Sequence, residues 1–202
     1  MTLRRAAALV LALVLGATSA AVAAEGLERL HPADLINPFL GPTYTRWLVG
    51  PVGQLADEEE RTLFLLLESN EEAAAFVEEF WSRRDGKLKR QFELRAAEAD
   101  KRYSESGLLG RRTDRGMVYI LFGDPDKTEW EEHRDIDDPH IELWTYPKGA
   151  AKGLNGKKPS RRYRFARDGD VMRLFSNDPN DPNNRRRRMI RRIREPPRRP
   201  WR

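Results

Sequence analysis

GRRTDRGMVYILFGDPD, residues 110–126, places an uninterrupted apolar run between two polar turns. The run Met117–Phe122 shows no polar alternation, which fits either a strand covered on both faces or a short buried helix. The flanking glycines and the Val-Tyr-Ile content favour the strand. We therefore expect a buried strand over residues 117–122.

Three amphipathic helices are expected ahead of this stretch. Asp57 can cap a helix that starts at the next residue, and Ser69 forms a capping box with Glu72 for a second helix. Gly86 is a plausible stop for that second helix. A third helix is expected over 88–105, where apolar side chains recur about every four residues.

Two further segments have strand patterns. Residues 141–146 (IELWTY) alternate as a half-buried strand does, and residues 163–175 contain two strands joined at Asp168-Gly169, a strong hairpin signal. Helices followed by strands are typical of an α+β domain. We expect N-terminal amphipathic helices packed on one face of a roughly four-stranded antiparallel sheet.

The first 24 residues have the layout of a secretory signal peptide. Arg4 and Arg5 precede the apolar run Ala6–Leu15, and Ala21-Val22-Ala23 resembles a cleavage site. The prediction is export to the periplasm or cell envelope of a bacterium, with no transmembrane helix after cleavage. An uncleaved membrane anchor is the alternative. Because the chain contains no cysteine, disulfides, thiolate metal sites and cysteine nucleophiles are excluded.

The rest of the chain divides into three parts. We expect an extended Pro/Gly-rich arm over 25–56, an α+β domain over 57–176 and a disordered Arg-rich tail over 177–202. The apolar side chains of the arm are expected to lie on a surface of the domain: Leu35, Phe39, Trp47 and Leu48.

The positive charge of the chain is concentrated in this tail. The last eighteen residues hold ten Arg and one Glu. Subtracting the tail's +9 and the +2 of residues 1–23 from the chain's +5 leaves −6 for residues 24–184. The tail is either a solvated terminus or a segment that docks on anionic lipid, lipopolysaccharide phosphates or an acidic protein. Export makes nucleic acid an unlikely partner. The candidate surface-binding residues are Arg185, Arg186, Arg187, Arg188, Arg191, Arg192 and Arg194.

Several of these elements together resemble the GWxTD domain of bacterial exported proteins, over about residues 45–176. The resemblance rests on 110–116, on the GDPD turn at 123–126, on FWSRRD at 80–85 and on the helix before the first turn, 99–104. The tryptophan of the family motif is Arg111 here, and the proline that often follows FWxxRD is Gly86. The resemblance implies a fold and an exported location, but no activity.

We interpret the polar residues of this motif as structural. Short Thr and Asp side chains hold turns through their own backbone, and glycines permit dihedral angles that side chains forbid. Arg84 and Asp85 are expected to pair with the neighbouring turn, for example at Asp114, and a substrate clamp is the alternative for these two residues. The alternative is a catalytic carboxylate pair, Asp114 and Asp124. The structural set is Gly110, Thr113, Asp114, Arg115, Gly116, Gly123, Pro125, Trp81, Arg84 and Asp85.

Two loops separate the expected strands. The acidic loop 131–140 contains the best metal candidates, whose imidazoles and carboxylates are ligands for zinc or calcium, although a solvated acidic loop has the same composition. The second loop, 147–160, is basic and glycine-rich and is expected to be flexible. The candidate ligands are His133, Asp135, Asp137, Asp138 and His140.

The sequence carries no motif for a Ser or Cys nucleophile and no nucleotide-binding loop, so no catalytic residue and no cofactor is expected. The favoured hypothesis is an exported, non-catalytic binding or scaffold module whose partner is another envelope protein or an anionic membrane surface. The alternative is an envelope hydrolase or metal-dependent enzyme that uses Asp114, Asp124 and the 133–140 loop.

Overall fold

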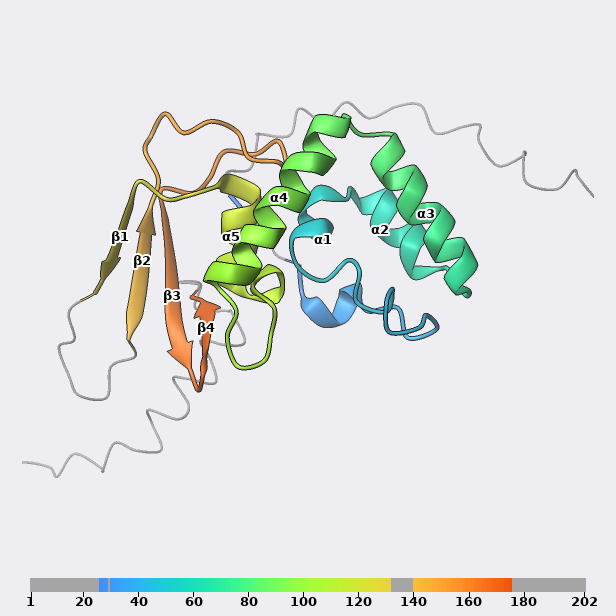
Figure 1. Cartoon of the computed structure of the whole chain (residues 1–202), viewed down its shortest axis with the longest axis horizontal. Coiled ribbons are helices and arrows are strands. Elements are labelled where there is room, and N and C mark those ends of the chain that lie inside the picture. Colours follow the sequence, from blue (N-terminus) through green and yellow to red (C-terminus); the bar gives the residue numbers. More distant parts are fainter. Residues whose placement is uncertain (1–25, 29, 132–139, 176–202) are drawn as a thin grey trace, which may run out of the picture.

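The computed structural model describes residues 26–28, 30–131 and 140–175 (Figure 1). In these ranges the helices come first and a four-stranded antiparallel sheet follows, so the predicted α+β class is confirmed. The helical elements before the motif are η1 (Pro32–Leu35), α1 (Pro51–Leu55), α2 (Glu58–Leu65), α3 (Asn70–Ser82) and α4 (Gly86–Arg102).

Both predicted helix starts are confirmed. Asp57 and Ser69 are N-caps of α2 and α3, and each forms a complete capping box with the glutamate three residues on. Gly86 does not stop α3. It is the first residue of α4, because the Asp85 side chain accepts a hydrogen bond from Lys87 N and caps the new helix.

The expected strand over 117–122 is wrong. These residues lie in helix α5 (Asp114–Phe122), which follows a short 3-10 turn, η2 (Gly110–Arg112). Thr113 caps the start of α5, and Gly123, at φ +79°, ends it. A helix that is apolar on most sides is buried, and so short an apolar run cannot be distinguished from a strand by periodicity.

The sheet is a meander in the order β1-β2-β3-β4. The strand predicted over 141–146 is confirmed at 141–145 and pairs with 162–166. The predicted hairpin turns at Asp168-Gly169, where Gly169 has φ +62°. The first strand, which pairs with β2, was not expected from the sequence. The strands are β1 (Lys127–Trp130), β2 (Ile141–Thr145), β3 (Arg162–Asp168) and β4 (Val171–Leu174).

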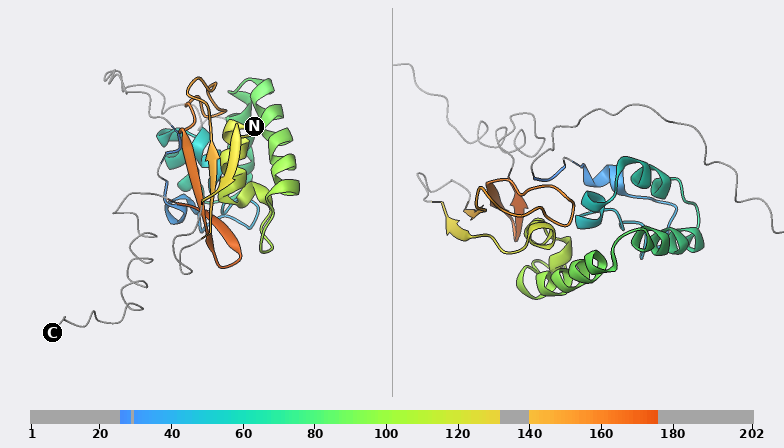
Figure 2. Two further views of the ribbon diagram at one scale, coloured as in Figure 1. Left: turned by 90° about the vertical axis from the view of Figure 1, so that its left-hand side faces the viewer. Right: turned by 90° about the horizontal axis from the view of Figure 1, so that it is seen from above.

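Two hydrophobic clusters fill the molecule. The sheet cluster is formed by side chains of the sheet, α5 and α4. Helix α5 lies between the sheet and α4 (Figure 2). The helical cluster joins the arm to α1, α2 and α3, so these helices do not contribute to the layer on the sheet. The large buried side chains of the sheet cluster are Tyr103, Val118, Tyr119, Ile120, Trp144, Tyr146, Tyr163, Phe165 and Met172. Those of the helical cluster are Leu35, Leu40, Leu48, Val52, Phe64 and Phe80.

The arm packs into the helical cluster and contains both η1 and α1. Leu35 and Leu48 are buried, and Trp47 lies with its ring centroid 4.9 Å from that of Phe64. We expected Phe39 to pack against a surface of the domain, but its side chain is 73% exposed. Its neighbour Leu40 is the buried residue of that turn.

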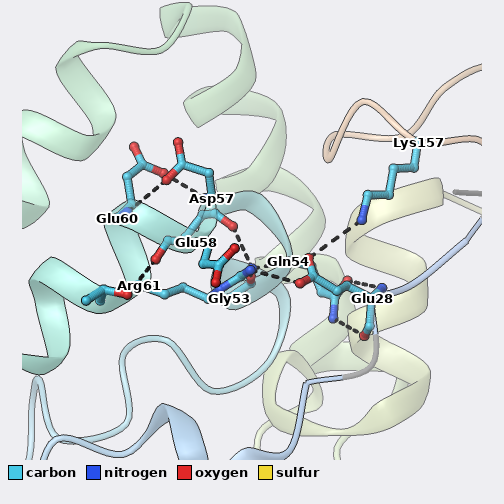
Figure 3. Close-up of polar contacts among 10 residues, drawn as sticks. Glu28, Gly53, Gln54, Asp57, Glu58, Glu60, Arg61 and Lys157 are labelled. Carbon is cyan, nitrogen blue, oxygen red and sulfur yellow. Dashed lines mark hydrogen bonds and ion pairs between the residues drawn. The ribbon is translucent and has the colours of Figure 1, made fainter. Parts of the chain in front are cut away.

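Glu28 connects the start of the described chain to three other elements (Figure 3). Its backbone N–H donates to the Gln54 side chain of α1 at 2.8 Å. Its carboxylate pairs with Arg61 of α2 at 2.8 Å and lies 3.6 Å from Lys157, in the loop before β3. We call this set of contacts the Glu28 clasp.

Candidate functional site

The motif turn, residues 110–116, is organised around Thr113. Its hydroxyl donates to Gly110 O at 2.9 Å and accepts from Gly116 N at 3.1 Å. The side chain is 3% exposed. A short hydroxyl that reaches both backbone groups of its own turn fixes the entry into α5.

The glycines of this turn are required by close backbone contacts. A Cβ on Gly110 would lie 1.8 Å from Ala99 O of α4, and one on Gly116 would lie 1.8 Å from Gly110 O. No side chain fits at such distances. The turn therefore presses η2 directly against the backbone of α4.

Two carboxylates cover the outer edge of β4. In its antiparallel register, the N–H groups of Met172 and Leu174 point away from β3. Asp114 accepts from Leu174 N at 2.6 Å, and Glu105 accepts from Met172 N at 3.1 Å. Burial raises the pKa of the Asp114 carboxyl, and the hydrogen bond from Leu174 N counteracts part of that rise. This edge of the sheet is thereby closed to further strands.

Arg115 links the same region to β2. Its guanidinium contacts Glu105 at 2.7 Å and Glu142 at 3.0 Å. Glu142 is 6% exposed and also accepts from Trp144 Nε1 at 2.7 Å. The Arg115 guanidinium therefore pairs with two carboxylates at once. Through Glu142 it links α5 to β2, and through Glu105 it links α5 to the outer edge of β4.

Arg111 occupies the position of the family tryptophan and anchors the turn by charge. Its backbone N–H and guanidinium both donate to the Asp100 carboxylate of α4, at 2.6 to 2.8 Å. Burial works to raise the pKa of Asp100, but the hydrogen bonds from Arg111 outweigh it and hold that pKa below its ordinary value.

The second motif turn, at the end of α5, is held by other side chains. Tyr146 Oη donates to Gly123 O at 2.8 Å, and Arg95 of α4 donates to Ile120 O at 3.0 Å. Asp124 pairs with Arg102 at 2.8 Å on the surface, where Asp124 is 62% exposed. These contacts satisfy the carbonyl groups at the end of the helix.

The FWSRRD element lies in the helical cluster. Arg84 pairs with Glu60 of α2 at 2.6 Å and donates to Leu55 O at 3.2 Å. The expected pairing of Arg84 and Asp85 with Asp114 is therefore wrong. Trp81 packs on Phe92 of α4, with ring centroids 5.2 Å apart.

Glu60 is buried beside this arginine. Burial works to raise its pKa, but hydrogen bonds from Arg84 and from Asp57 N lower it overall. The arginine of this element therefore joins α2 to α3 and the end of α1, within a single cluster.

The structure does not bring the two candidate catalytic carboxylates together. Asp114 begins α5 and Asp124 follows its end, and eight helical steps alone separate two residues by about 12 Å. A pair that acts on one bond would need its carboxylates within roughly 5–10 Å.

The metal candidates remain untested. His133, Asp135, Asp137 and Asp138 lie outside the described residues, as do all seven candidate arginines of the tail, and His140 is exposed. Among the residues that the structure does describe, no group of three or more His, Cys, Asp or Glu side chains is placed to hold a metal ion.

Sequence reasoning missed Glu105, Glu142 and Glu60. Glu142 could have been recognised from the sequence, because it alternates with Trp144 and Tyr146 on the buried face of the strand, where a charged residue is unusual. Glu105 lies in a polar turn and carried none. Glu60 was visible only as the N3 residue of a capping box.

A family model for the GWxTD domain matches residues 39–171, which is more than half of the chain. The protein belongs to the GWxTD domain family. No curated protein and no solved structure gives a significant match. Within the described ranges, none of the helices has the length and apolar character needed to cross a bilayer.

Proposed function

We propose that this protein is an exported, non-catalytic binding module of the bacterial cell envelope. The proposal is carried by the difference between the two edges of its sheet. The β4 edge is filled by the Asp114 and Glu105 carboxylates, whereas no strand lies beyond β1 within the described part of the chain. An edge strand with unpaired backbone groups is a template for pairing with another chain.

The side chains of β1 are suited to a surface contact. All four residues of the strand are exposed, and Trp130 at its end is 60% exposed. An exposed tryptophan beside an open sheet edge offers both apolar area and backbone pairing to a partner protein. The Asp114 and Arg115 side chains of the motif, by contrast, form internal hydrogen bonds.

Site-specific photocrosslinking tests this proposal. A photoreactive phenylalanine analogue at Trp130 should give a discrete adduct with one envelope protein in living bacteria. The same analogue at the exposed Arg173, on β4, should give none. Adducts from both positions in equal amount, or from neither, would contradict the proposal.

The arginine tail is proposed as a second means of attaching the protein to its surroundings. Ten arginines in eighteen residues favour docking on an anionic surface. Truncation after Asn184 should weaken binding to anionic vesicles at low salt. Unchanged binding by the truncated protein would refute a role for the tail.

A further inference from the structure

A second basic surface lies on the folded domain itself. The basic segment, residues 147–162, joins β2 to β3 and holds six cations and no carboxylate. Because residues 24–184 carry −6 in total, removing this segment leaves −12 for the rest of that part. A strongly positive segment in an otherwise acidic body is a local electrostatic feature, not a reflection of the average charge.

Three of these cations surround a hollow of about 200 Å³. Lys148, Lys158 and Arg161 are all exposed, and none of them forms an ion pair with a carboxylate of the described residues. Lys157 differs, since it points to the Glu28 clasp (Figure 3). Apolar side chains line the same hollow: Pro147, Ala150 and Pro159.

Hydrogen bonds tie the basic segment to its surroundings, although its glycines led us to expect a flexible loop. Leu154 N donates to Leu121 O of α5 at 2.9 Å, and Gly153 N donates to Lys157 O at 2.8 Å. A Cβ on Gly153 would lie 2.5 Å from the Phe122 ring, so the backbone is pressed against α5. Cations held on a fixed backbone lose less conformational entropy when they bind.

The described chain begins beside this segment, and its last residue contacts β3. Gly26, its first residue, donates to Lys158 O at 2.6 Å. At the other end, Phe175 N donates to Arg164 O at 2.6 Å, three positions after Arg161. The blue start of the ribbon and the orange loop before β3 lie together in Figure 2.

We propose that the basic segment docks on the phosphate groups of an anionic phospholipid surface through Lys148, Lys158 and Arg161. This inference rests on the proposed attachment of the tail and extends it to the folded domain. The three cations are open to solvent, and the exposed Pro147 adds apolar surface to the same hollow. Two weak basic elements in one chain give more stable attachment than either gives alone.

Vesicle sedimentation at low salt tests this docking with four versions of the protein. They are the wild type, a loop variant (K148Q, K158Q and R161Q), a tail variant with its seven candidate arginines changed to Gln, and a matched control. The control, K101Q, R112Q and R167Q, removes the same charge from exposed positions in α4, η2 and β3, outside the basic segment. The vesicles contain phosphatidylglycerol in phosphatidylcholine, with pure phosphatidylcholine as the neutral comparison.

The loop variant should lose on the order of 100-fold in affinity for the anionic vesicles, at about 5-fold per cation removed. The control should stay within about 3-fold of the wild type, apart from the small effect of net charge. The tail variant should keep residual binding through the basic segment. The loop variant and the control should melt at temperatures similar to the wild type, since their substituted side chains are exposed.

Three results would overturn the inference. If the loop variant binds like the wild type while the tail variant does not bind, the tail alone carries attachment and the proposed function stands. If no version binds anionic vesicles, both proposals of lipid docking fail. If millimolar inorganic phosphate raises the wild-type melting temperature and vesicles do not bind, the hollow serves a soluble phosphate instead.

Discussion

The helical cluster is held together by packed aromatic rings. The sheet cluster also contains packed rings, but in addition carboxylates accept hydrogen bonds from its backbone N–H groups. Around Trp47, the centroids of Phe64 and Phe80 each lie at 4.9 Å. In the sheet cluster, Asp114 and Glu105 bind the outer N–H groups of β4. Strands of four residues form few ladder bonds, so side-chain acceptors complete the hydrogen bonding that a longer sheet would supply itself.

The charged pairs of the two clusters also differ. Arg84 and Glu60 form one pair, in which the guanidinium also lies 3.5 Å over the Phe80 ring. Arg115 serves two glutamates, and the carboxyl of Asp114 beside them is made less acidic by burial. The helical cluster therefore favours the ionised form of its acid, and the sheet cluster disfavours the ionised form of Asp114.

The largest effect is expected from Phe64→Ala in the helical cluster. Phe64 is fully buried against two other rings, so its removal should lower the free energy of unfolding by about 4 kcal/mol. Phe39→Ala, at a side chain that is 73% exposed, should change it by less than about 0.5 kcal/mol. Urea unfolding of both variants checks this, and similar values for the two would contradict the packing described.

Gly110→Ala should be the next most damaging change, and it acts on the sheet cluster. The added methyl would meet Ala99 O at 1.8 Å, so α4 and the motif turn must separate, at a cost of about 3 kcal/mol. Gly86→Ala is the matched control, because a Cβ there meets nothing within 4 Å. The comparison is made by thermal and urea unfolding. A Gly110 variant as stable as the Gly86 variant would show that the close contact is absent.

Glu60→Gln should lower the free energy of unfolding by about 2 kcal/mol at pH 7, because Arg84 keeps its charge and loses its counter-ion. Since the pKa of Glu60 is lowered on folding, its contribution is fully present above its ordinary value of 4.5 and is lost as the pH falls through the lowered pKa. The wild type should therefore lose its advantage over Glu60→Gln on acidification. A gap that stays constant from pH 7 to pH 3 would count against this ion pair.

Asp114 should show the opposite pH dependence. Its pKa is raised on folding, so the folded state is penalised as the pH rises from its ordinary value of 3.8 through the raised pKa. Asp114→Asn keeps an acceptor for Leu174 N and should lose less than about 1 kcal/mol, whereas Asp114→Ala should lose about 1.5 kcal/mol. The wild type should lose stability relative to the Asn variant between about pH 3 and pH 7. If the Asn variant unfolds like the wild type but abolishes a measurable turnover, the structural interpretation of the motif is wrong.

The smallest effect is expected from Arg111→Ala. The pair with Asp100 is half-exposed on the arginine side, at 47%, and such pairs contribute up to about 1 kcal/mol. The loss should shrink in 1 M NaCl, since salt screens exposed charges. A loss above about 2 kcal/mol that salt leaves unchanged would mean that Arg111 anchors the turn by packing and not by charge.

Much of the fold was predictable from local signals. The two capping boxes, the Asp168-Gly169 hairpin and the alternation of residues 141–146 each depend on residues within a few positions of one another. The apolar run of α5 was not resolved by such signals, because its helical state depends on caps at Thr113 and Gly123 that also suit the ends of a strand.

The contacts of the candidate site depend on tertiary structure and were largely unpredictable. The partner of Arg84 is 24 residues away in sequence, and Glu105 meets Met172 across 67 residues. Side chains of a single residue type fit many such pairings, so the sequence alone does not choose among them. The close approach of Gly110 to α4 was likewise visible only as a glycine in a turn.

The Glu28 clasp has a consequence for the order in which the chain reaches its final form. During synthesis the amino-terminal residues emerge first. Glu28, however, needs Gln54 and Arg61, and then Lys157, which is added 129 residues later. A residue among the earliest to be made therefore waits for nearly the whole polypeptide before its last neighbour arrives.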